Sequence, residues 1–206
     1  MHVFDKREIE ENHKRYIERI DLYKTYGYDS IAEREFILEC AGPLDGKILE
    51  IGTGKGYLTV TAARNGYSFI TVDPSEENQR FAKLNAAYYG VSHRIDFRTG
   101  DVYSLEFPEA VFDVAIFVNT YHHIGRAQDA LEEINRILAP GGRLILSDFT
   151  EAGFDLVEKV HESEGYHHDR GSHPRGYAFR SLKEMGFTIR TENSDFQYVL
   201  IASKPR

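Results

Sequence analysis

The chain has 206 residues, of which 41% are hydrophobic and 28% are charged, and its 25 basic and 33 acidic side chains give a net charge of −8. These values are typical of one globular domain, and they exclude a disordered chain, a collagen-like repeat and a coiled-coil rod. The basic residues form no block of the kind that binds nucleic acid, so we expect no nucleic-acid partner. Apolar runs such as residues 114–118 are far shorter than the roughly 20 residues that span a bilayer, so we expect no membrane insertion.

Cysteine usage and the first residues bear on the cellular compartment. Cys40 is the single cysteine, so no intrachain disulfide can form, which is typical of proteins in a reducing compartment. Residues 1–8 contain no apolar segment of the kind found in a signal peptide. We therefore expect a cytoplasmic protein, and a homo-oligomer is compatible with these features.

The first part of the chain has helical patterns. Residues 5–24 combine mixed charges with apolar residues at helical spacing. Ser30 and Glu33 have the spacing of a capping box, in which two polar side chains bond to the first N–H groups of a helix. They predict a second helix that starts at Ser30. We interpret residues 1–42 as an N-terminal helical cap and residues 43–206 as the main domain.

From residue 47 onward, short apolar runs alternate with helical patterns. The runs predict strands at residues 48–51, 68–72, 95–97, 112–118 and 143–146, and the patterns between them predict helices at residues 57–65, 75–89 and 127–138. The last helix is expected to stop at the Pro-Gly-Gly sequence of residues 140–142.

This alternation is typical of a parallel sheet with helices on both faces. Two final runs, residues 187–191 and 197–202, are too close in the chain for a helical crossover, so we expect them to pair antiparallel. The expected fold is therefore α/β: a Rossmann-like, seven-stranded, doubly wound sheet with its last strand antiparallel, preceded by N-terminal helices.

Residues 150–177 interrupt the pattern, and we predict a helix near residues 154–163 followed by a loop to about residue 175. The segment holds four histidines, at positions 161, 167, 168 and 173. Their spacing matches no specific metal motif, so no metal site is predicted, and an exposed loop is the simpler interpretation. Because the segment follows the fifth predicted strand, it is also a candidate substrate lid, with the N-terminal helix as the other part.

The first predicted strand runs into the loop Gly52-Thr53-Gly54-Lys55-Gly56. A phosphate-binding P-loop is excluded because Leu49 and Gly56 occupy two of its required positions. The dinucleotide fingerprint matches only in part, because Tyr57 stands where its third glycine belongs. Glu50 lies just before the turn and would repel a pyrophosphate, whereas it suits a ligand that carries an ammonium and a sulfonium. Lys55 weakens this argument, since it could neutralise Glu50.

Asp73 ends the second predicted strand, 21 residues after Gly52. An acidic residue about 20 residues beyond such a loop receives ribose hydroxyls in doubly wound folds. The alternative is structural: Asp73 caps the helix that Pro74 begins.

With these motifs, residues 44–149 resemble the class I S-adenosylmethionine-dependent methyltransferases, specifically the type 11 group that includes ubiquinone and menaquinone biosynthesis enzymes. The resemblance is carried, in chain order, by residues 48–56, 72–75, 100–102, 107–114, 119–123 and 138–144. It implies S-adenosylmethionine as cofactor. It also implies the cofactor-binding residues Glu50, Gly52, Thr53, Gly54, Gly56, Asp73, Pro74, Asp101, Val102 and Asn119.

Within this resemblance, the glycines pack under the methionine moiety and Asn119 lies below the sulfonium. Asp73 binds the ribose, Asp101 accepts the adenine amino group and Val102 packs on the adenine ring. Two features depart from the family pattern: Lys55, and the segment after Phe149, which matches no particular subfamily. The second departure leaves the substrate open.

Methyl transfer is an in-line displacement, for which the cofactor supplies the activated carbon and the protein mainly positions the acceptor. His122 and His123 follow the strand at residues 112–118, so either is a candidate catalytic base. A structural interpretation is equally good: one imidazole packs inward and the other faces solvent.

The expected function is transfer of a methyl group to an unidentified small-molecule acceptor. Two alternatives stand beside it. One is an NAD(P)-linked oxidoreductase on a related fold, against which Glu50, Tyr57 and residues 100–102 argue. The other is a non-catalytic S-adenosylmethionine-binding protein.

Overall fold

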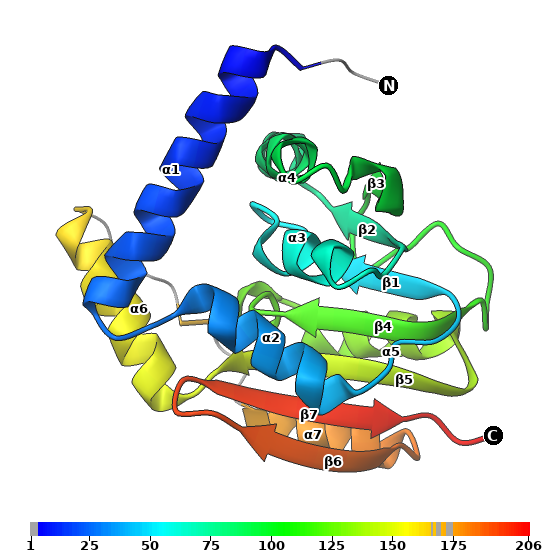
Figure 1. Ribbon diagram of the computed structural model, residues 1–206. Coiled ribbons are helices and arrows are strands. Elements are labelled where there is room, and N and C mark those ends of the chain that lie inside the picture. Colours follow the sequence, from blue (N-terminus) through cyan, green and yellow to red (C-terminus); the bar gives the residue numbers. More distant parts are fainter. Residues whose placement is uncertain (1–3, 166, 168–169, 172–174) are drawn as a thin grey trace.

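A computed structural model describes residues 4–165, 167, 170–171 and 175–206. Its described residues form one sheet of seven strands in the order β3-β2-β1-β4-β5-β7-β6 (Figure 1). The strands are β1 (Ile48–Ile51), β2 (Phe69–Asp73), β3 (Ile95–Thr99), β4 (Phe112–Val118), β5 (Leu138–Phe149), β6 (Thr188–Asn193) and β7 (Gln197–Ser203). The first five pair in parallel, and β7 is antiparallel to both β5 and β6. The predicted fold and the predicted terminal hairpin are confirmed.

Helices cover both faces of the sheet. They are α1 (Lys6–Thr25), α2 (Ser30–Ala41), α3 (Tyr57–Arg64), α4 (Glu76–Tyr88), α5 (Ala127–Ile137), α6 (Glu151–Ser163) and α7 (Arg175–Glu184), with 3-10 turns at Ser92–Arg94 and Tyr121–His123. Alternate residues of a strand point to opposite faces. Accordingly Leu49 and Phe117 pack with α5 and α7, whereas Ile48 and Ile116 pack with α2 and α3.

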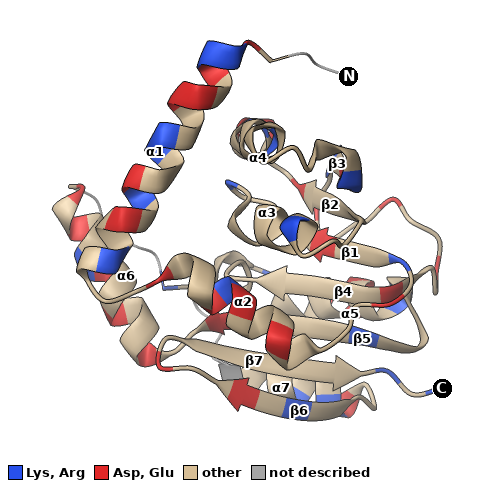
Figure 2. Cartoon of the chain, in the orientation of Figure 1, with Lys and Arg blue, Asp and Glu red and all other residues tan. Residues whose placement is uncertain are grey.

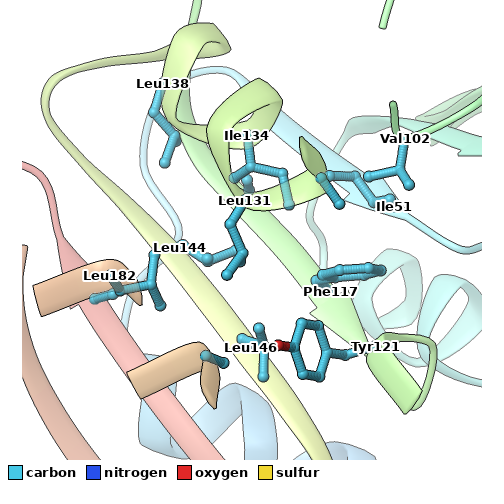
Figure 3. Close-up of a cluster of buried hydrophobic side chains, with 14 of the residues drawn as sticks. Ile51, Val102, Phe117, Tyr121, Leu131, Ile134, Leu138, Leu144, Leu146 and Leu182 are labelled. Atoms are coloured by element: carbon cyan, nitrogen blue, oxygen red, sulfur yellow. The ribbon is translucent and has the colours of Figure 1, made fainter. Parts of the chain in front are cut away.

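The larger core lies under α5 and α7. Phe117, Leu131 and Leu146 are fully buried there, and Figure 3 shows them converging from β4, α5 and β5. Burial of each such side chain stabilises the fold by about 1.5–3 kcal/mol. This core holds the strands in register, and it thereby fixes where each strand ends at the carboxyl edge of the sheet.

Two boundaries differ from the sequence expectation. The cap of α2 is Asp29 and not Ser30: the Asp29 carboxylate accepts from the N–H groups of Ile31 and Ala32. Aspartate is as good a cap as serine, so the chain uses the earlier position. Glu33 does not bond back to the cap; its carboxylate accepts from the Ser194 hydroxyl at 2.6 Å.

The second difference lies after α5, which ends at Ile137. Leu138 is already extended and pairs with Phe112, so β5 begins before the Pro-Gly-Gly sequence instead of after it. The register shifts between Phe112 and Val114, which accommodates the extra residues in β5. A Cβ on Gly142 would lie 2.8 Å from the Ala139 carbonyl oxygen, so glycine is required at this irregularity.

The helices α1 and α6 lie together at the end of the sheet to which the β4 arrow points (Figure 1). Charged side chains of both signs follow α1 along its length, whereas the central strands carry few (Figure 2). The buried residues of α1 are Asn12, Tyr16 and Ile20, and Tyr16 stacks on Tyr57 of α3 at 4.9 Å between ring centroids. In the described part of the chain, no helix combines the length and apolar composition needed to cross a bilayer.

Candidate functional site

The glycine loop lies directly after β1, at the carboxyl edge of the sheet. Gly52, Gly54 and Gly56 all have positive φ, at 84°, 51° and 86°. A Cβ on Gly52 would lie 2.3 Å from Thr120 Oγ1, and one on Gly56 would lie 2.8 Å from the Cβ of Ala82. A Cβ on Gly54 would meet nothing within 4 Å. Two of the glycines therefore serve close packing inside the protein, and Gly54 alone borders open space.

Glu50 is buried beneath this loop, with 3% of its surface exposed. Both Thr59 and Thr71 donate hydroxyl hydrogen bonds of 2.7 Å to its Oε2 atom. Burial raises the pKa of the Glu50 carboxyl to about 7, with a smaller contribution from Asp73, although the two hydroxyls oppose the shift. Oε1 is not bonded to any described residue. An ionised Glu50 is thus costly without a counter-charge, and a cation beside it would relieve that cost.

Asp73 ties the glycine loop to the turn after β2. Its Oδ2 accepts from the N–H of Gly54 and its Oδ1 from the N–H of Ser75, both at 2.8 Å. The cap of α4 is Ser75, whose hydroxyl accepts from the N–H of Asn78. The capping alternative for Asp73 is therefore wrong. Because a carboxylate has about four acceptor positions, Asp73 keeps capacity for further donors.

Asn119 follows β4 in an unusual conformation. Its φ is +49°, a region that residues other than glycine rarely adopt. Its backbone N–H donates to the Ser147 carbonyl, but both polar atoms of its side-chain amide are buried without a partner among the described residues. Backbone strain and an orphaned amide at one residue are typical of functional sites.

These side chains surround a cavity of about 270 Å³. Seven of the predicted site residues line it: Glu50, Gly52, Thr53, Gly54, Asp73, Asn119 and His123. The remaining lining residues are Arg34, Lys55, Tyr57, Leu58, Asn78, Val118 and Thr120. Arg34 comes from α2, outside every motif, so no local pattern could have identified it.

Five predicted residues lie outside the lining of this cavity: Gly56, Pro74, Asp101, Val102 and His122. Asp101 is exposed, and its carboxylate accepts from the N–H of Tyr103 at 3.0 Å. Val102 is buried near Ile51 at the edge of the main core (Figure 3). The assignment of Asp101 and Val102 to the adenine end stays a prediction.

The two adjacent histidines have different surroundings. His122 is buried, and its Nδ1 lies 2.7 and 2.9 Å from the two carboxylate oxygens of Asp148, which also accepts from the His122 N–H. Asp148 lies near the end of β5 and was not identified from the sequence. His123 is exposed and lines the cavity. The arrangement matches the alternative in which one imidazole packs inward and the other faces solvent.

The histidines after β5 contact α1 and α6. His161 is buried, and its Nε2 lies 3.2 Å from the Tyr23 hydroxyl. His167 Nδ1 is 2.9 Å from Glu158, and with Glu162 these side chains form a group whose ligand atoms lie within 4.8 Å of one another. The ion pair itself explains this exposed group. Tyr166, His168 and His173 lie outside the described residues.

Residues 49–146 match the family model described as "Methyltransferase domain". The chain is 26% identical over 170 residues to the ubiquinone/menaquinone biosynthesis C-methyltransferase UbiE of Roseobacter denitrificans, covering 81% of this chain and 63% of that protein. It is 27% identical over 170 residues to the enzyme of the same name from Azotobacter vinelandii, covering 81% and 62%. The chain thus spans less than two thirds of the length of these relatives.

Solved structures share the fold. The [4+2]-cyclase SpnF superposes with a TM-score of 0.69 at 19% identity, covering 86% of this chain and 82% of that one. Phosphoethanolamine N-methyltransferase 2 of Haemonchus contortus gives 0.67 at 20% identity, covering 85% and 53%. Geranyl diphosphate methyltransferase in complex with its cofactor gives 0.63 at 19% identity, covering 86% of each chain.

Proposed function

We propose that this chain, which carries a class I S-adenosylmethionine-dependent methyltransferase domain, transfers a methyl group from S-adenosylmethionine to a small-molecule acceptor. The observation that supports this most is the cavity at the carboxyl edge of the sheet. There Glu50, Asp73 and the orphaned amide of Asn119 line one space. Ligands of open α/β sheets bind at this edge.

The residues present fit the cofactor. Glu50 and Asp73 offer carboxylate oxygens to an ammonium and to ribose hydroxyls, and Gly54 leaves the loop open beside them. The dinucleotide alternative fits less well, because a pyrophosphate would lie near both carboxylates. When bound, the cofactor supplies a methyl group activated by a sulfonium.

The chain itself positions the acceptor and manages protons. His123 lines the cavity and is the better candidate base, because it is accessible from the cavity. His122 is held by Asp148, and we assign it the role of a positioning residue beside His123, with 3.9 Å between the two ring centroids. The helices α1 and α6, with the segment after α6, are the parts of the chain that we propose as the acceptor lid.

A calorimetric titration tests this proposal. The protein should bind S-adenosylhomocysteine and should not bind NADPH, and binding of NADPH alone would favour the oxidoreductase alternative. A second assay follows the labelled methyl group into candidate acceptors. A protein that bound S-adenosylhomocysteine but transferred the label to none of them would support the non-catalytic alternative, because a fold alone does not fix the activity.

A further inference from the structure

Two buried asparagines connect the N-terminal helix α1 to the glycine loop. Asn12 of α1 and Asn85 of α4 are only 4% and 2% exposed. The side-chain amide of Asn12 donates to Asn85 Oδ1 at 2.8 Å, and the side-chain amide of Asn85 donates to the backbone carbonyl of Lys55 at 3.1 Å. We call these three groups the amide relay. The relay joins α1, α4 and the glycine loop.

The direction of both hydrogen bonds follows from the chemistry of their ends. A backbone carbonyl can only accept, so Asn85 must turn its NH₂ group toward Lys55. Its amide oxygen then faces Asn12, which must donate, and the Asn12 NH₂ group also lies 3.4 Å from the Phe81 carbonyl oxygen. Because the Asn12 donor holds the Asn85 amide in this orientation, the two hydrogen bonds of the relay support each other.

The Lys55 carbonyl is one of several backbone groups that fix the shape of the glycine loop. The Gly54 N–H is bonded to Asp73, and the Gly56 N–H is bonded to the Thr53 carbonyl at 3.0 Å. Lys55 lies between the two glycines and lines the proposed cofactor cavity. The relay therefore fixes the loop at this residue and ties it to α1.

A second contact of α1 reaches the residue that follows the loop. Tyr16 lies one helical turn after Asn12 and stacks on Tyr57 at 4.9 Å between ring centroids. Tyr57 also lines the proposed cofactor cavity. Through Asn85 and through this stack, α1 thus holds the chain at two points only two residues apart. The position of α1 and the shape of the glycine loop are therefore coupled.

Stability alone does not explain two buried amides at this helix junction. Replacing both partners of a buried hydrogen bond by apolar groups of the same shape is nearly neutral or stabilising, and leucine has the branched shape of asparagine. The other buried side chains of α1, Tyr16 and Ile20, present mainly apolar surface. Buried polar side chains between helices are best known for fixing how the helices align.

We propose that Asn85 and Asn12 are positioning residues for the cofactor. They hold the Lys55 carbonyl, and with it the glycine loop, in the shape that lines the cavity, and they make docking of α1 and binding of the cofactor mutually favourable. This inference rests on the proposed function, since S-adenosylmethionine is the ligand that the loop receives. By linkage, the factor that docked α1 adds to cofactor affinity is also the factor by which the cofactor strengthens the docking of α1.

The test removes the amides without leaving a hole. S-adenosylhomocysteine is titrated into the wild type, Asn12→Leu, Asn85→Leu and the double variant that carries both changes. The control is Asn135→Leu, which changes a half-buried asparagine of α5 on the opposite face of the sheet. Denaturant melts of all five proteins give their stabilities.

Each single change leaves a buried amide group unpaired and should lower stability, whereas the double variant should recover most of that loss. If the relay positions the loop, this recovery does not extend to binding. The double variant should bind S-adenosylhomocysteine about three- to tenfold more weakly than the wild type, as expected for one lost hydrogen bond. Asn12→Leu should also bind more weakly, although Asn85 and Lys55 are intact, and the control should bind like the wild type.

Native-state hydrogen exchange supplies the reciprocal measurement. Saturation with S-adenosylhomocysteine should slow exchange of the α1 amides less in Asn12→Leu than in the wild type. The difference should equal the factor that Asn12→Leu loses in affinity. A purely structural role of Asn12 would lower the stability of α1 equally with and without the ligand.

Wild-type affinity in either Asn12→Leu or the double variant would overturn the proposal. Should the double variant not fold, Asn12→Leu decides, because its change is confined to the N-terminal helix. Failure of the proposed function has a different signature, since the wild type would then not bind S-adenosylhomocysteine. In that case exchange of the Gly56 amide decides: faster exchange in Asn85→Leu than in the wild type and the control supports the positioning of the loop, and equal exchange overturns it.

Discussion

At the scale of single residues, Glu50 is the side chain whose chemistry depends most on its surroundings. Burial raises the pKa of this carboxyl from an ordinary 4.5 to about 7, so the folded state binds a proton more tightly than the unfolded state. Its contribution to stability is therefore fully present below pH 4.5 and is lost as the pH rises through 7. A ligand ammonium reverses this preference, because it favours the ionised form.

We predict that Glu50→Gln removes this pH dependence. Relative to the variant, the unloaded wild type should lose roughly 3 kcal/mol of unfolding free energy between acid and mildly alkaline pH. Denaturant melts across that range provide the measurement, with the exposed Glu106→Gln as control. S-adenosylhomocysteine should also bind the wild type more tightly above pH 7 than below it. A constant difference between wild type and Glu50→Gln at all pH values would contradict the prediction.

Substitutions at Asp73 and Ser75 can distinguish the effect of ribose binding from the effect of helix capping. We predict that Asp73→Ala weakens S-adenosylhomocysteine by about 1.5–3 kcal/mol, because charged hydrogen bonds to the ligand are lost. It should also lower the melting temperature, since the N–H groups of Gly54 and Ser75 lose their acceptor. Ser75→Ala removes the cap of α4 and should cost about 0.5–2 kcal/mol of stability with affinity unchanged. Equal effects of both variants on affinity would show that Asp73 acts only through the loop.

At the scale of elements, alanine substitutions in the glycine loop can distinguish the energetic cost of a positive φ from that of a steric overlap. We predict that Gly54→Ala costs only about 1–2 kcal/mol, the price of a positive φ for an L-residue. Gly52→Ala should cost clearly more, because its Cβ would also overlap Thr120 at the end of β4. Thermal melts of both variants test this. The reverse order would mean that Thr120 moves aside without cost.

The strands and helices could be predicted from the sequence where the spacing of hydrophobic residues and the position of turn residues indicate the same element. The five parallel strands and α3 to α5 follow that agreement. The short connection expected at residues 192–196, which the structure narrows to residues 194–196, left room only for a hairpin. The sequence did not show the irregularity in β5, because Pro140 and the glycines after it are usual helix terminators as well as usual bulge residues. Asp29 and Ser30 are both good caps, so propensity could not choose between them.

Long-range contacts explain what the sequence missed in the site. Glu50, Asp73 and Asn119 each lie at or next to the carboxyl end of a parallel strand, so topology alone brings them to one edge of the sheet. Asp148 was missed although it also lies at such a strand end, because nothing in its local sequence distinguishes it. Arg34 reaches the cavity from α2, and only the packing of that helix against the sheet reveals it.

At the scale of the whole molecule, residues 1–42, which we interpreted from the sequence as an N-terminal helical cap, include two helices with different packing. Ile37 and Leu38 of α2 belong to the same buried cluster as Ile48 and Val114 of the central sheet. In α1, by contrast, Tyr16 and Ile20 are the buried apolar residues among many charged ones. The helix α2 is thus part of the main core, whereas α1 is anchored by fewer apolar contacts.

Native-state hydrogen exchange tests this distinction. We predict that the amides of α2 exchange together with those of β1 and β4, at the free energy of global unfolding, while α1 exchanges by a local opening of lower free energy. Adding S-adenosylhomocysteine should slow exchange in α1 more than global stabilisation alone requires, because Tyr57, on which Tyr16 stacks, lines the cofactor cavity. If α1 and α2 instead opened together below the energy of the sheet, these two helices would form one separate unit.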